Sequence, residues 1–175
     1  IAFNQPIGDW DVSNVKNMSL MFANSTFNQP IGDWNVSKVT IMNGMFEGAH
    51  IFNQPIGDWN VSRVTDINSI FCNASKFNQP IGDWNVCNVK NMSFMFFKAI
   101  KFNQPIGGWD VSSVTNMSSM FSSATEFNQP ICDWDVCKVV YMMRMFCDAS
   151  EFELKNKPNI IKSELETTKK NIRKR

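Results

Sequence analysis

The sequence predicts an α/β solenoid of six strand-turn-helix units, each about 25 residues long, with a helical cap at its C-terminal end. The first observation is a repeat, because Phe-Asn-Gln-Pro-Ile recurs at spacings of 24 or 25 residues. The second is that each unit combines a strand-like and a helix-like apolar pattern. A unit this short cannot bury its own apolar face, whereas stacked units form a continuous core. The units begin at Phe3, Phe27, Phe52, Phe77, Phe102 and Phe127.

The second unit shows how each element is predicted, with its places numbered from 1 at the Phe to 25. Segment 34–36 alternates apolar, polar and apolar residues, which predicts a short strand. In segment 42–49 apolar residues fall at i, i+3, i+4 and i+7, which predicts a short helix. Thr40 is the expected N-cap of that helix. Pro30 keeps the return segment out of a central strand, and Gly32 permits a turn.

The spacing of apolar residues favours one solenoid class over another. Ile31, Trp34, Val36 and Val39 match the front of the leucine-rich pattern, although Val39 stands where Asn or Cys is expected and Leu is rare. We therefore expect a leucine-rich-repeat-like right-handed solenoid. The alternative is an all-β right-handed β-helix with three short strands in each coil.

The chain divides into two parts by composition. Residues 1–152 form the predicted six-unit solenoid, and residues 153–175 carry 8 Lys/Arg against 3 Glu. Ile161, Leu165 and Ile172 share one face of an expected basic amphipathic helix, which would cap the last unit. A targeting or nucleic-acid role for the basic end, and a solvated tail, are the alternatives.

The repeat resembles that of a known family. Its consensus, F-N-Q-P-I-G-D-W-[DN]-V-S-x-V-x-x-M-x-x-M-F, is similar to the repeat of about 26 residues in BspA-like leucine-rich repeat surface proteins. Such repeats also occur in mycoplasma lipoproteins, protists and large DNA viruses. The resemblance covers Phe3 to Phe152 and implies a surface-exposed or secreted binding protein of unknown molecular function. It brings no catalytic residues, and no signal segment is visible, so an intracellular location is left open.

Composition narrows the possible functions. The chain has one His and a formal net charge of +1, which argues against His-based metal sites, His-dependent triads and nucleic-acid binding. No apolar run approaches the ~18 residues of a membrane span. The five cysteines form no Cys-x-x-Cys pair, so we expect free thiols. The prediction is a non-enzymatic scaffold without cofactor, metal or small-molecule substrate, whose partner is a protein or a surface ligand.

The candidate interaction surface has two parts. A polar column at place nine should face outward with successive side chains ~4.8 Å apart. Its alternative use is a structural or adhesive array that binds Ca²⁺ through carboxylates. Phe94 and Phe97 form the second part, because they make the fourth unit unusually apolar outside its core pattern. The column comprises Asp11, Asn35, Asn60, Asn85, Asp110 and Asp135.

Three structural expectations accompany this surface. The Asp at place seven, in Gly-Asp-Trp, should form a turn hydrogen bond to its own backbone. The Asn-Gln pairs at places two and three should hydrogen-bond between units as a ladder. Each Trp should be largely buried in the stack.

Overall fold

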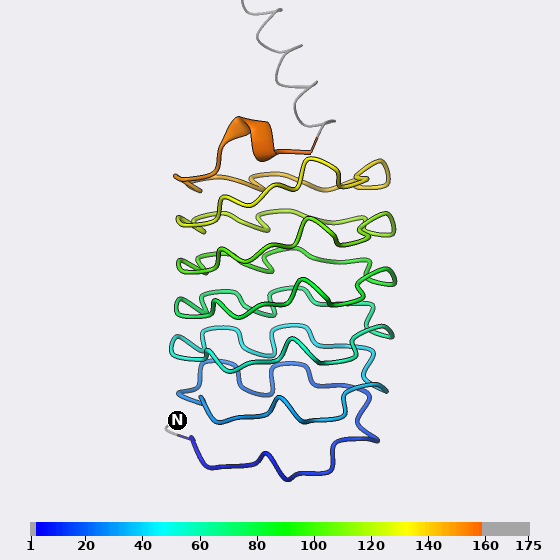
Figure 1. Ribbon diagram of the computed structural model, residues 1–175, viewed down its shortest axis with the longest axis vertical. Helices are drawn as coiled ribbons and strands as arrows, with labels where there is room; N and C mark the ends of the chain where they lie inside the picture. The colour runs from blue at the N-terminus through cyan, green and yellow to red at the C-terminus, as the bar shows by residue number, and fades with distance from the viewer. Residues whose placement is uncertain (1–2, 159–175) are drawn as a thin grey trace, which may run out of the picture.

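The computed structural model describes residues 3–158, which form a tall column of layers (Figure 1). Each repeat unit makes one layer, and the chain climbs from the blue N-terminal layer to the orange C-terminal one. Backbone hydrogen bonds join every layer to the next. The six layers span residues 3–26, 27–51, 52–76, 77–101, 102–126 and 127–151.

The predicted secondary structure is wrong in both of its versions. Within residues 3–158 the only helix is η1, a 3-10 helix at Leu154–Asn156. The same part of the chain has isolated β-bridges in place of strands, and the rest is turns and coil. The chain is therefore neither the α/β leucine-rich-repeat-like right-handed solenoid with a helical cap nor the all-β right-handed β-helix.

Local turns explain why the helix-like spacing of segment 42–49 produces no helix. The N–H of Met45 closes a turn onto the carbonyl of Met42, at 3.2 Å. The N–H groups of Gly44 and Gly48 instead donate to carbonyls of the next layer. These two residues have φ values of 61° and 66°, and left-handed backbone cannot continue a right-handed helix.

This left-handed backbone recurs at places 18 and 22 of every layer, whatever residue stands there. Each such residue turns the chain, so places 16, 19, 20 and 23 point inward without helical geometry. The residues concerned are Leu20, Asn24, Gly44, Gly48, Ser69, Asn73, Phe94, Lys98, Ser119, Ser123, Arg144 and Asp148.

Short turns also explain the absence of strands in the described layers. Segment 34–36 has a turn on each side, since Trp34 N–H donates to Ile31 O at 3.2 Å and Val39 N–H to Val36 O at 2.9 Å. The extended stretch between them is too short to pair. One parallel bridge therefore remains at each interface between layers, at place 15.

The core is built from side-chain columns that run the length of the stack. Phe46 packs on Phe52 of the following layer with ring centroids 3.9 Å apart, and on Phe71 at 5.8 Å. The same contacts recur through the molecule, so two Phe columns make one continuous stack of rings. Aromatic rings bury large apolar areas, which is the main stabilising contribution here.

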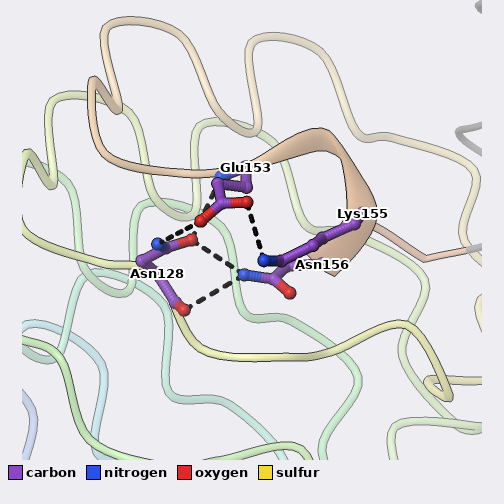
Figure 2. Close-up of polar contacts among 4 residues, drawn as sticks. All are labelled: Asn128, Glu153, Lys155 and Asn156. Atoms are coloured by element: carbon purple, nitrogen blue, oxygen red, sulfur yellow. Dashed lines mark hydrogen bonds and ion pairs between the residues drawn. The ribbon is translucent and has the colours of Figure 1, made fainter.

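The residues after the sixth layer continue its hydrogen bonding although their sequence differs (Figure 2). The N–H of Glu153 donates to Asn128 Oδ1 at 3.1 Å, and Asn156 Nδ2 donates to the same oxygen at 2.8 Å. Lys155 Nζ lies 2.8 Å from Glu153 Oε2. Asn156 and Pro158 are buried, so residues 152–158 cover part of the sixth layer.

The predicted capping helix lies mostly outside the described residues. Of the 153–175 segment, only residues 153–158 are described, and Ile161, Leu165 and Ile172 fall beyond them. Within the described part of the chain, no helix has the length and apolar character needed to cross a bilayer.

Candidate interaction surface

Two segments of each unit hydrogen-bond to the neighbouring layers, and we call them the constant segment and the loop segment. The constant segment is places 1–10, residues 27–36 in the second layer, and its sequence is nearly identical in all six units. The loop segment is places 17–22, residues 43–48 in the second layer, and its sequence varies at places 17, 18, 21 and 22, whereas place 19 is Met or Ile and place 20 is always Phe. The polar groups of each segment show which surface is free to bind.

The Trp of the constant segment joins each layer to the layer before it. The indole N–H of Trp84 donates to the carbonyl of Ile56 at 3.0 Å, and Trp84 is only 3% exposed. Trp34, Trp59, Trp109 and Trp134 make the same bond. The predicted burial is thus confirmed for five of the six Trp residues. Trp10 is 55% exposed, because the described residues place no layer on that side of it.

The Asn-Gln column is a hydrogen-bond ladder, as predicted. Asn78 Oδ1 accepts from the N–H of Asn103 at 3.0 Å and from Gln104 Nε2 at 3.1 Å. The backbone bond recurs from Asn4 to Glu153, and every buried side-chain nitrogen and oxygen in residues 3–158 has a partner. At the end of the ladder the side-chain amide of Asn156 donates to Asn128, as the Gln side chain does in the other layers. Sequence reasoning missed this residue because the repeat consensus ends after Phe152.

Glycine at place six is required by a close approach between layers. A Cβ added to Gly82 would lie 2.6 Å from the carbonyl oxygen of Pro105, which is closer than real Cβ contacts. The sixth layer has Cys132 at this place. The chain that follows it forms η1, whereas each earlier layer is followed by a layer with Pro at place four.

The predicted polar column at place nine makes local turns. Asn60 Oδ1 accepts from the N–H of Ser62 at 3.2 Å and from its hydroxyl at 2.7 Å. The equivalent backbone bond exists in every layer. In the fifth layer the hydroxyl and N–H of Ser112 lower the pKa of Asp110 below its ordinary value. One oxygen of each side chain at place nine is thus committed to shaping the turn that follows Val at place ten.

The turn bond predicted for place seven is therefore formed at place nine instead. In the described layers the place-seven Asp side chains are exposed and make no hydrogen bond. No three His, Cys, Asp or Glu side chains gather in a metal-binding group among residues 3–158. The Ca²⁺ alternative thus has no supporting geometry in this part of the molecule.

The regular interlayer hydrogen bonds of the loop segment run between backbone atoms, and side chains add interlayer hydrogen bonds only at place 17, from Ser19 to Asn43 and from Asn68 to Ser93. The N–H groups of Phe94 and Lys98 donate to carbonyls of the fifth layer, both at 2.9 Å. Four such bonds, from places 16, 18, 20 and 22, cross every interface between layers. The side chains at places 18, 21 and 22 take no part in these bonds, so the hydrogen bonding between layers does not fix their identity, although Cys72, Ser119 and Ser122 among them are buried.

The structure brings Phe94 and Phe97 together on this segment. Their ring centroids lie 5.9 Å apart at an interplanar angle of 75°, and Lys98 Nζ lies 5.1 Å from the centre of the Phe97 ring. Phe94 is 40% exposed. The six place-nine residues form a separate column along the constant segment, so the predicted surface is two surfaces.

The cysteines are free thiols, as predicted. Cys72 and Cys147 share place 21, but Cys72 is buried and Cys147 is exposed. Burial, with a smaller contribution from Glu47, raises the pKa of the Cys72 thiol to about 11. Cys72 is therefore a packing residue with little thiolate at neutral pH.

One family description matches almost the whole sequence. The family described as "Mycoplasma protein of unknown function, DUF285" matches residues 1–96 and again residues 70–171. No curated protein and no solved structure matches the chain. The family description assigns no activity.

Proposed function

The chain belongs to the DUF285 family, and we propose that it is a non-enzymatic repeat scaffold that binds a protein or a surface ligand through its loop segments. The observation that carries this proposal is the contrast between backbone-mediated and side-chain-mediated stacking. Places 18, 21 and 22 can change without loss of an interlayer hydrogen bond, so they can be specific for a partner.

The variation among the six layers supports this assignment. Place 18 holds an aliphatic, a glycine, an aromatic, a cationic and two serine residues, all on the same left-handed backbone. Place eight, by contrast, holds Trp in every layer. A rigid array that displays different side chains at fixed positions is the arrangement that repeat proteins use for binding.

The resemblance of the repeat to BspA-like surface proteins adds the finer part of the proposal. It suggests display at a cell surface, where a long regular array contacts an external partner. The same proposal includes no catalytic activity. The hydrogen bonds of the Asn, Gln and Trp columns hold layers together, so these side chains have a structural role.

Hydroxyl-radical footprinting in extracts of the source cells tests this proposal. We expect protection of loop-segment side chains in several consecutive layers, with no protection at the exposed Pro and Asp places of the constant segment. A heat-denatured extract is the matched control. Protection confined to the constant segment, or no protection anywhere, would show that the loop segments are not the binding surface.

A further inference from the structure

We propose that Phe94, Phe97 and Lys98 form the anchor of this surface, and that they bind an acidic peptide segment carrying an apolar side chain. This inference rests on the proposed function and names the partner chemistry of its central layer. No other layer has aromatic residues at places 18 and 21.

The backbone position of Phe94 argues that its side chain serves a contact outside the layer. Its φ is 56°, a conformation that is unfavourable for a residue with a bulky side chain. Serine stands at the same place in the third and fifth layers, with φ values of 56° and 55°, so stacking does not require an aromatic residue there. A partly exposed aromatic side chain on rigid backbone is the kind of group that dominates interface energetics.

Charge selects the class of partner. In the loop segments of the third, fourth and fifth layers, Lys98 is the only charged side chain. The other charged side chains of the loop segments are Glu47 in the second layer and Arg144 and Asp148 in the sixth. Within these three loop segments an acidic peptide therefore meets a cation and no carboxylate, while its apolar side chain covers Phe94 and Phe97.

Single-stranded nucleic acid fits these residues less well. Base stacking needs free ring faces in series and a basic groove that follows the backbone. Here the two rings meet edge to face, and Lys98 covers one face of Phe97. The three loop segments carry one cation, which is too few to follow a phosphate chain.

The repeat supplies its own matched variants for the test. Phe94→Ser, Phe97→Ser and Lys98→Asn install residues that other layers carry at these places, namely Ser119, Ser122 and Asn73. In the same triple variant, Ser119→Phe, Ser122→Phe and Ser123→Lys then move the anchor up by one layer. Thermal melts of both variants check that they remain folded, which matters most for the second because Ser119 and Ser122 are buried.

The probe is a fluorescein-labelled acidic peptide of about ten residues with a central leucine, measured by fluorescence anisotropy at low salt. We expect binding to the natural chain, at least about tenfold weaker binding to the triple variant, and recovery in the moved-anchor variant. The same peptide with alanine at its centre, a lysine-rich peptide and an oligo-dT strand should bind weakly.

Three results would overturn the inference: no binding of the acidic peptide to the natural chain, equal binding to the triple variant, or preferential binding of oligo-dT. The footprinting experiment tests the proposed scaffold function separately and does not depend on any of these three results. Protection of other loop segments together with failure of the acidic peptide would leave the scaffold function intact and remove only this anchor.

Discussion

The constant segment and the loop segment do the same work with different atoms. Both hold each layer to its neighbours, but the constant segment hydrogen-bonds through the side chains of Asn, Gln and Trp, whereas the regular hydrogen bonds of the loop segment come from peptide groups. A side chain that makes an interlayer bond cannot change without losing it. A peptide group makes the bond for any residue. The contrast therefore explains why the constant segment is nearly invariant within this chain while places 18, 21 and 22 of the loop segment vary; the Phe at place 20 is invariant because its ring stacks in the core.

The largest effect should come from removing a Trp of the constant segment. Trp84→Ala deletes a buried ring and leaves the Ile56 carbonyl without its indole donor, so we expect a loss of about 3–5 kcal/mol in the free energy of unfolding. Urea denaturation measures it. Trp10→Ala is the control, and its cost should be far smaller because Trp10 is 55% exposed. Equal costs would show that stacking does not depend on this column.

A smaller effect is expected from a methyl group at the tight contact between layers. Gly82→Ala places a Cβ 2.6 Å from the Pro105 carbonyl, which requires the layers to separate locally. Overpacking of this kind costs about 1–3 kcal/mol. Cys132→Ala, at the equivalent place of the sixth layer, should change the melting temperature little. A stable Gly82 variant would mean that the layers are more loosely stacked than this contact indicates.

The loop segment should respond to backbone preference and not to side-chain identity. Lys98 has a φ of 55°, so Lys98→Gly should be more stable than Lys98→Ala by about 1 kcal/mol. Chemical denaturation of the two variants gives the difference. An alanine variant as stable as the glycine variant would contradict the left-handed geometry at place 22.

The smallest effect concerns a surface turn. Hydrogen bonds from Ser112 favour the charged form of Asp110 and lower its pKa, so Ser112→Ala should raise that pKa toward the ordinary value. The turn bond contributes above the ordinary Asp pKa and is lost as pH falls through the lower, folded value. An NMR titration of the Asp110 carboxyl follows this directly. An unchanged pKa in the variant would assign the effect to another group.

The sequence predicted the layers but not the backbone within them. The period, the buried Trp column and the Asn-Gln ladder all depend on side chains that repeat. The repeated residue types can therefore be recognised directly in the sequence. The helix predicted for segment 42–49 failed because places 18 and 22 turn left-handed even where Phe, Lys or Arg stands. The sequence signals that conformation at Gly44 and Gly48 in the second layer and, more weakly, at Asn24, Asn73 and Asp148 at place 22. The turn at place nine was missed because the more prominent Gly-Asp-Trp signal drew the assignment to place seven.

The bonds of the loop segment have an electrostatic consequence. At places 15 and 16 one peptide group accepts from the layer before through its carbonyl and donates to the layer after through its N–H, and three further peptides in each layer do the same. All four columns point the same way along the stack. Each peptide carries a dipole of about 3.5 D, and aligned peptides add. These four columns therefore carry a lengthwise field, as an α-helix does, with its positive pole toward the sixth layer and its negative pole toward the first. A column at place 14, whose N–H groups donate to the layer before, opposes it in part.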